Sequence, residues 1–261
     1  MEQYTDFAEV YDLFMDNVPY DEWCGYIDAL LRDYGIKPGL NTEVPLVCEL
    51  GCGTGSITRR LRDKGYDMIG IDASGRMLQK AMEQEKKGDD SILYLCQDMR
   101  EFELYGTVAA VVSVCDSLNY LTGDGELADV FGLVNNYLEP GGLFVFDMKT
   151  PYYYSRMLGE STICENRDEG SFIWENYYDP ESRINEFDMT VYIRDGKNDR
   201  YRRFEETHYQ RSYTLTEIRK ALKKAGLELL DVFEAFTRKT PSKQAERVYF
   251  IARTGKKYEI R

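Results

Sequence analysis

The sequence predicts an α/β fold, in which helices cover both faces of a mostly parallel sheet and a small antiparallel sheet is inserted late in the chain. Apolar runs alternate with amphipathic helical segments between residues 44 and 148, as is typical of parallel strands joined by helices. Residues 150–212 are instead rich in tyrosine and charge. With 261 residues, 43% of them hydrophobic, the chain can bury one large core with an appended lobe.

The first half of the chain provides the alternating elements. Apolar and aromatic residues recur at helical spacing through residues 1–34, interrupted by Pro19, which predicts two helices before the first strand. The expected elements after them are a strand at 44–50, a helix at 56–64, a strand at 67–71, a helix at 75–87, strands at 92–96 and 108–114, a helix at 125–138, a turn at 139–142 and a strand at 143–148.

The second half of the chain carries the antiparallel pattern. In INEFDMTVYI, four apolar residues at every second position share one face, as in a half-buried antiparallel strand: Phe187, Met189, Val191 and Ile193. A helical pattern returns at 214–225. Two further strands, at 227–236 and 246–253, could close the main sheet as a hairpin.

A loop of alternating glycines follows the first strand. Gly51, Gly53 and Gly55 permit turns and close backbone approaches that a Cβ would block, and the helix that begins near Ser56 offers free N–H groups to a polar or anionic ligand. A dinucleotide site expects G-x-G-x-x-G/A, whereas the spacing here is G-x-G-x-G. The glycines alone therefore leave the ligand open.

Acidic residues at three successive strand ends narrow the choice. Asp72 is placed to bind both hydroxyls of a ribose, which NAD and S-adenosylmethionine share. Glu49 would repel a pyrophosphate but suits a cationic sulfonium that also carries an ammonium group. Asp98 could accept a hydrogen bond from an exocyclic amine such as adenine N6, although a carboxylate there also often caps a helix.

The segments CELGCGTGS, GIDAS, CQDM and VCDSLNYL together resemble the class I S-adenosylmethionine-dependent methyltransferases, in particular the small-molecule branch with a β-rich insertion. The resemblance extends over essentially the whole chain. It implies a Rossmann-like sheet of seven strands whose last strand is antiparallel, with S-adenosylmethionine as cofactor and S-adenosylhomocysteine as product. It also implies a cofactor domain formed by 1–149 and 213–261, of which 1–43 are a helical lid, and a substrate lobe at 150–212.

The resemblance also implies the residues of the site. The glycines lie beneath the methionine part of the cofactor, with Asp72 on the ribose, and Tyr4 and Tyr11 belong to the lid that closes over the cofactor. The expected cofactor-binding residues are Tyr11, Glu49, Gly51, Gly53, Gly55, Asp72, Ala73, Met77, Asp98, Met99, Cys115 and Asp116. The expected acceptor-binding residues are Asn119, Tyr120, Trp174, Tyr178, His208 and Arg211.

His208 is the only histidine and the candidate catalytic base. Strict alternation places it on one strand face with Phe204, Glu206 and Gln210. A lone histidine is usually a surface or satisfied core residue, but the insertion can form a roof over the carboxyl ends of the strands, where ligands collect. A hydroxyl acceptor would need such a base, whereas an amine needs only to arrive unprotonated.

The expected function is methyl transfer from S-adenosylmethionine to a nitrogen or oxygen atom of a small molecule. One alternative is an NAD(P)-dependent oxidoreductase, which would share the first strand, the glycine loop and Asp72. A second is a module that binds S-adenosylmethionine without turnover. A nucleic acid methyltransferase is disfavoured, because CDSLNY stands where an N-P-P-Y or D-P-P-Y motif would be expected.

Composition limits the partners. Lys and Arg number 33 against 46 Asp and Glu, and the resulting charge of −13 repels nucleic acid. No apolar run reaches the roughly 20 residues of a membrane span, and the N-terminus lacks a basic region before an apolar core, so a cytoplasmic protein is expected. The expected assembly is a monomer or a homodimer. The six cysteines form no C-x-x-C pair, which predicts reduced, mostly buried thiols and no metal site.

Overall fold

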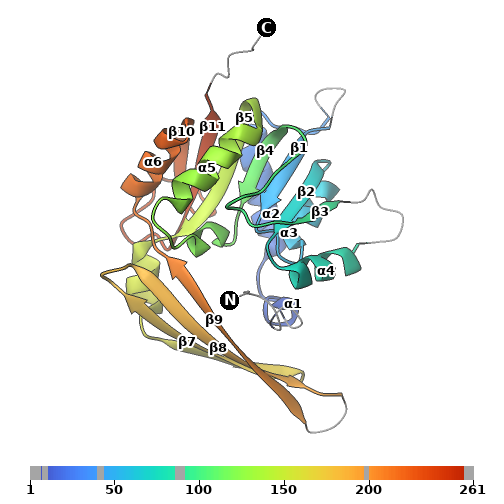
Figure 1. The fold of residues 1–261 in the computed structure, drawn as a ribbon, viewed down its shortest axis with the longest axis vertical. Helices are drawn as coiled ribbons and strands as arrows, with labels where there is room; N and C mark the ends of the chain where they lie inside the picture. Colours follow the sequence, from blue (N-terminus) through green and yellow to red (C-terminus); the bar gives the residue numbers. More distant parts are fainter. Residues whose placement is uncertain (1–6, 8–10, 40–43, 86–91, 197–199, 256–261) are drawn as a thin grey trace.

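Two sheets organise the chain in the computed structural model, which describes residues 7, 11–39, 44–85, 92–196 and 200–255 (Figure 1). The main sheet has seven strands in the order β10-β11-β5-β4-β1-β2-β3. Its strands are β1 (Leu46–Leu50), β2 (Asp67–Asp72), β3 (Leu93–Cys96), β4 (Val108–Ser113), β5 (Leu138–Lys149), β10 (Leu227–Glu234) and β11 (Arg247–Thr254). The second sheet, which we call the lobe sheet, contains β6 (Thr162–Asn166), β7 (Gly170–Asp179), β8 (Ile184–Arg194) and β9 (Tyr201–Arg211).

Helices connect the strands of the main sheet. The α-helices are α1 (Tyr11–Phe14), α2 (Tyr20–Asp33), α3 (Ser56–Asp63), α4 (Gly75–Glu83), α5 (Glu126–Tyr137) and α6 (Leu215–Lys224). A 3₁₀-helix, η2 (Ser117–Tyr120), follows β4, and a π-helix, η3 (Tyr153–Leu158), leads from β5 into the lobe sheet. In the described part of the chain, no helix has both the length and the apolar character needed to cross a membrane.

The strand directions confirm the predicted topology. β1 pairs in parallel with β2 and β4, and β4 pairs in parallel with β5. β11 is antiparallel to both of its neighbours, β5 and β10. The main sheet is therefore parallel except for its last strand, and β10 and β11 form the expected hairpin.

Two boundaries between residues 44 and 148 differ from the sequence prediction by more than two residues. Residues 139–142 were expected to form a turn before the fifth strand, but β5 already begins at Leu138. Val108 pairs with Leu138 whereas Ala110 pairs with Leu143, so the extra residues bulge out of an otherwise continuous strand. Gly141, at a φ of +81°, permits this bulge. Helix α4 ends at Glu83 instead of residue 87, and 86–91 lie outside the described residues.

Each face of the main sheet carries its own core. On one face α5 and α6 pack against a cluster that contains the contacting rings of Phe131, Phe144, Phe146 and Phe250. On the other face, α2 and α3 cover a cluster that includes Ile27. Burial of both faces explains why the central strands read as continuous apolar runs.

Helix α1 lies between the lobe sheet and the glycine loop (Figure 1). The ring of Phe14 contacts Phe172 of β7 edge to face, with ring centroids 4.9 Å apart. The carboxylate of Asp12 accepts hydrogen bonds from the Thr54 hydroxyl at 2.7 Å and from Gln84 Nε2 at 2.5 Å. One short helix therefore connects the two parts of the fold. Tyr4, expected in the same lid, lies outside the described residues.

The lobe sheet alternates as predicted. Phe187, Met189 and Val191 of β8 are buried, and Ile193 on the same face is partly buried. The six cysteines, all within the described ranges, are free thiols, but Cys96 and Cys164 are exposed. The prediction of mostly buried thiols thus fails at these two positions, which lie at strand positions open to solvent.

Candidate functional site

The glycine loop turns through left-handed backbone conformations. Gly51, Gly53 and Gly55 have φ values of +72°, +54° and +74°, a region that favours glycine. A Cβ on Gly51 would lie 2.5 Å from Ser117 Oγ, whereas a Cβ on Gly53 would have no described atom within 4 Å. Gly53 therefore faces open space, and Gly55 caps the N-terminus of α3.

A cavity of about 580 Å³, which we call the loop cavity, lies over the carboxyl ends of β1, β2 and β4. Ten of the expected cofactor residues line it: Tyr11, Glu49, Gly51, Gly53, Asp72, Ala73, Met77, Asp98, Met99 and Cys115. Gly55 is absent from this lining, and Asp116 lines a second cavity instead. Ten of the twelve expected residues therefore share one cavity, because parallel strands end at a common edge.

Glu49 is a buried carboxyl group, only 3% exposed. The Thr58 hydroxyl donates a hydrogen bond to its Oε2 atom. Burial raises the pKa of Glu49 to about 8, although the bond from Thr58 opposes this shift. The group is therefore mainly protonated at neutral pH, and a nearby cation would draw it into its ionised form.

Asp72 supports the glycine loop from beneath. Its Oδ2 atom accepts a hydrogen bond from the Gly53 N–H at 2.8 Å, and its Oδ1 atom accepts one from the Ser74 N–H at 2.8 Å. Burial raises the pKa of Asp72, while the two backbone bonds lower it. Asp98 forms an ion pair with Arg100 at 3.0 Å and still lines the loop cavity. A carboxylate has further acceptor positions, so either group can also bind a ligand.

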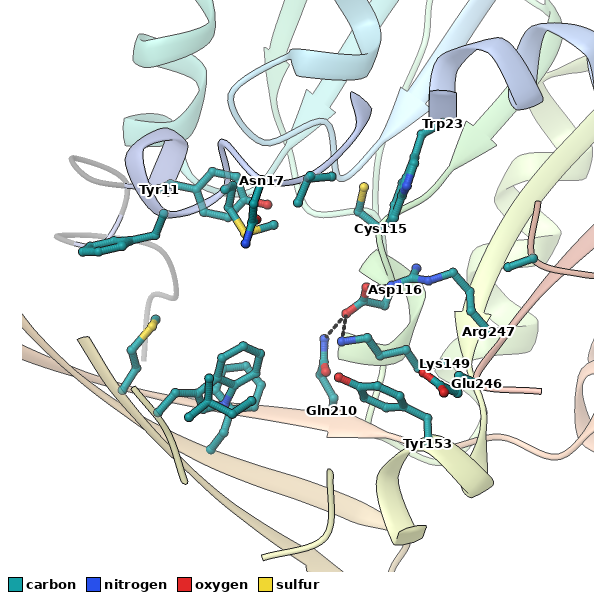
Figure 2. Close-up of a pocket in the computed structure, with 18 of the residues that line it drawn as sticks. Tyr11, Asn17, Trp23, Cys115, Asp116, Lys149, Tyr153, Gln210, Glu246 and Arg247 are labelled. Carbon is teal, nitrogen blue, oxygen red and sulfur yellow. Dashed lines mark hydrogen bonds and ion pairs between the residues drawn. The ribbon is translucent and has the colours of Figure 1, made fainter. Parts of the chain in front are cut away.

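A second cavity of about 700 Å³, which we call the lobe cavity, lies between the lobe sheet, α1 and the ends of β4, β5 and β11. Its apolar wall includes Phe7, Phe14, Phe172, Trp174, Phe187 and Met189. The lining also contains a polar group, and Figure 2 shows Lys149 and Gln210 directed at Asp116. The Asp116 Oδ2 atom lies 3.3 Å from Lys149 Nζ and 3.0 Å from Gln210 Nε2.

A strained backbone corner separates β4 from η2. Cys115 and Asp116 have φ values of 60° and 58°, a conformation that costs a non-glycine residue about 1–3 kcal/mol. The fully buried Asp147 carboxylate accepts both of their N–H groups, at 3.3 and 2.9 Å. Arg247 donates to Asp147 and to Asp116 at 2.7 Å each, with its guanidinium over the ring of Trp23. We call Asp116, Asp147 and Arg247 the corner cluster.

Opposing influences set the ionisation of the corner cluster. Burial alone would raise the pKa of Asp116, but the charges of Lys149 and Arg247 outweigh it and lower this pKa. Burial raises the pKa of Asp147 despite Arg247. Burial also raises the pKa of the Cys115 thiol well above its usual range, which agrees with its interpretation as a buried thiol that is not a nucleophile.

The two cavities meet at three residues. Tyr11, Cys115 and Tyr120 line both of them. Tyr11 comes from α1, Cys115 from the end of β4 and Tyr120 from η2. A ligand in the loop cavity can therefore contact a ligand in the lobe cavity at this junction.

Four of the expected acceptor residues lie outside both cavity linings as the structure describes them: Asn119, Tyr178, His208 and Arg211. Asn119 bonds to the backbone of Lys149 and Arg211, the Tyr178 hydroxyl bonds to Ser212, and Arg211 bonds to Thr122 and Asp124. Trp174 and Tyr120 do line the lobe cavity. Contact of the other four with the acceptor stays a prediction.

The structure adds residues that the sequence reasoning missed. Lys149, Gln210, Asp147 and Arg247 come together with the predicted Asp116 although they are distant in the sequence. The sequence did contain an indication of the role of Asp147, because a charged residue inside an otherwise apolar strand needs a partner when it is buried. Gln210 had been assigned to the same face as His208, and both side chains are buried.

Comparison with known proteins agrees with this geometry. Residues 47–142 match a family model described as "Methyltransferase domain". The chain is 36% identical over 254 residues to "Putative methyltransferase YqeM" of Bacillus subtilis (strain 168), which covers 97% of this chain and 98% of that protein. It is 29% identical over 161 residues to a dTDP-3-amino-3,4,6-trideoxy-alpha-D-glucopyranose N,N-dimethyltransferase of Streptomyces venezuelae, covering 61% of this chain and 62% of that protein.

A solved structure extends the match to three dimensions. The crystal structure of an S-adenosylmethionine-dependent methyltransferase from Clostridium acetobutylicum ATCC 824 aligns with a TM-score of 0.84 and 28% identity, over 97% of this chain and all of that one. The loop cavity fits this cofactor, since Gly53 leaves space for it and Glu49 supplies a carboxyl group for a cation. S-adenosylmethionine is the cofactor, and the chain belongs to the class I S-adenosylmethionine-dependent methyltransferase family.

Proposed function

We propose that the protein transfers the methyl group of S-adenosylmethionine to an amine nitrogen of a small molecule held in the lobe cavity. The meeting of the two cavities at Tyr11, Cys115 and Tyr120 is the observation that carries this proposal. Methyl transfer from a sulfonium is an in-line displacement with a neutral leaving group. The protein must therefore mainly align the reactants and exclude water.

The cofactor occupies the loop cavity in this proposal. Asp72 binds the ribose, Asp98 and Met99 surround the adenine, and the glycine loop lies beneath the methionine part. Residues 1–149 and 213–261 form the domain that holds the cofactor, and residues 150–212 select the acceptor. Helix α1 contributes to both tasks, because Tyr11 lines both cavities.

The charges in the lobe cavity favour nitrogen over oxygen as the methylated atom. Its described lining contains four carboxyl groups, those of Asp116, Glu165, Glu234 and Glu246, but only two cationic side chains, Lys149 and Arg247. This excess of acid, beside an aromatic wall, attracts a protonated amine. The similarity to an N,N-dimethyltransferase that acts on an amino sugar nucleotide supports the same choice.

Matched acceptors test this proposal. The protein is incubated with S-adenosylmethionine labelled at the methyl group and with pairs of small molecules that differ only by amine against hydroxyl, such as glucosamine and glucose, nucleotide-linked amino sugars and alkyl amines. We expect label on amines and none on their hydroxyl partners. Label on the hydroxyl members would overturn the choice of nitrogen. If the protein bound S-adenosylmethionine tightly but methylated no amine, the result would favour the alternative of a module that binds the cofactor without catalysing a reaction.

Binding of S-adenosylmethionine should release a proton from Glu49. Because burial raises the pKa of this carboxyl to about 8, it is mainly protonated at pH 7, and the cationic ligand favours its ionised form. Affinity should therefore increase as the pH rises from about 6 towards 8. Calorimetry in two buffers of different ionisation enthalpy measures the released proton. The release should vanish in Glu49→Gln, and proton uptake in the unmodified protein would contradict the assignment.

A further inference from the structure

Tyr120 occupies a position at which it can exchange a proton with the acceptor. It lines both cavities at the junction where the proposed methyl transfer takes place. Its hydroxyl oxygen lies 3.4 Å from Nδ1 of His208, and the two rings meet edge to face with centroids 5.9 Å apart. His208 itself is fully buried behind Tyr120.

The partners of His208 fix its orientation and its tautomer. Nε2 lies 3.1 Å from Oε2 of Glu206, whose side chain is only 7% exposed. A carboxylate can only accept hydrogen bonds, so Nε2 carries the hydrogen and Nδ1 presents its lone pair to the Tyr120 hydroxyl. Phe187 stacks on the imidazole at 4.9 Å with the ring planes 4° apart, and the Phe7 N–H donates to the second Glu206 oxygen at 3.0 Å.

The other candidate bases at the junction are poorly suited to this task. Asp116 lines the lobe cavity, but its carboxylate already accepts bonds from Arg247, Lys149 and Gln210. The positive charges of Arg247 and Lys149 stabilise the ionised form of Asp116 and make it a weak base. The Cys115 thiol stays protonated, because burial raises its pKa. Tyr120 differs from both, since it connects the junction to an imidazole.

We propose that Tyr120, His208 and Glu206 form a relay that removes a proton from the bound ammonium group of the acceptor. The N–H bond of the ammonium breaks as an O–H bond forms on Tyr120, and the original phenol proton passes to Nδ1 of His208. The imidazolium is then paired with Glu206. The freed amine lone pair forms the N–CH₃ bond while the S–CH₃ bond breaks. The relay rests on the proposed function and makes Tyr120 the catalytic residue, with His208 and Glu206 acting through it.

The relay moves positive charge away from the reacting centre. An ammonium group facing the cofactor sulfonium would suffer like-charge repulsion and would have no lone pair to attack the methyl group. Transfer to His208 places the charge beside a carboxylate on β9 instead. This effect explains why a buried histidine is placed behind a tyrosine at the junction of two cavities.

Nuclear magnetic resonance tests the tautomer without an acceptor. Since His208 is the only histidine, the long-range ¹H–¹⁵N spectrum of the imidazole contains one residue. We expect a protonated Nε2 and an unprotonated Nδ1, and a change of the Nδ1 shift in Tyr120→Phe but not in Tyr177→Phe, an exposed control in the lobe sheet. A hydrogen on Nδ1 would overturn the relay.

Kinetics test the proton transfer. In Tyr120→Phe we expect kcat for a strongly basic alkyl amine to fall by about 100-fold while the Kd of S-adenosylmethionine stays unchanged. The loss should nearly disappear for an aryl amine that is already unprotonated at neutral pH. His208→Asn should resemble Tyr120→Phe, and the double variant should lose little more. If Tyr120→Phe lowered kcat equally for the alkyl and the aryl amine, the relay would be overturned but the proposed function would stand. If the unmodified protein methylated no amine, the proposed function itself would be overturned.

Discussion

Replacing Arg247 with methionine should lower the free energy of unfolding by about 3–5 kcal/mol, since it leaves the buried Asp147 carboxylate without its partner. Arg247 also holds the Asp147 carboxylate that accepts the N–H groups of Cys115 and Asp116, so the strained corner should shift and cofactor binding should weaken as well. Denaturant unfolding followed by tryptophan fluorescence measures the first effect, and calorimetry with S-adenosylmethionine measures the second.

Arg238→Met is a matched control for this prediction. Arg238 also pairs with an aspartate, Asp33, but both side chains are substantially exposed, and such surface pairs contribute about 0–1 kcal/mol. Combining Arg247→Met with Asp147→Asn removes the unpaired charge and should recover part of the stability. If Arg247→Met cost no more than Arg238→Met, the corner cluster would not support the fold as we describe.

Replacing Asp72 with alanine should weaken the binding of S-adenosylmethionine by about 1–3 kcal/mol, because in the proposed arrangement it removes charge-assisted hydrogen bonds to the ribose. The structure gives a second reason to expect weaker cofactor binding in this variant. The Gly53 and Ser74 N–H groups would lose their acceptor, and the glycine loop would no longer be held in its conformation. Calorimetric titration of the variant gives the change in Kd directly.

Two further variants separate these contributions. Asp67→Ala removes an exposed aspartate from the opposite end of β2 and should leave cofactor affinity intact. Asp72→Asn retains one carbonyl oxygen for the loop but loses the negative charge, so its loss of affinity should be intermediate. Unchanged binding by Asp72→Ala would show that the ribose lies elsewhere.

The part of the site that could be predicted is the part determined by local sequence. Glu49, Asp72 and Asp98 each stand near the end of a short apolar run. The carboxyl ends of parallel strands meet at one edge of the sheet, and this does not depend on the conformation of the loops. Period-two alternation likewise placed His208 and Gln210 on the same face of β9, and the structure buries both side chains.

The corner cluster could not be predicted in the same way. It depends on the register of β11 against β5, in which Arg247 stands opposite Lys149 and Tyr249 stands opposite Asp147. A shift of one residue would turn Arg247 to the other face of the sheet, and no local signal sets that register. The place of His208 behind Tyr120 also depends on how the lobe sheet docks onto η2, a contact between segments far apart in the chain.

Strand β9 presents neighbouring side chains to two different cavities. Tyr209 lines the loop cavity, whereas its neighbour Gln210 lines the lobe cavity. Because side chains alternate along a strand, the proposed assignment of the cavities predicts that mutation of Gln210 changes acceptor preference while Tyr209 keeps its place beside the cofactor. Related enzymes could thus diverge in substrate by point substitution within one strand, whereas deletion of a single residue there would exchange the two faces and impair both ligands together.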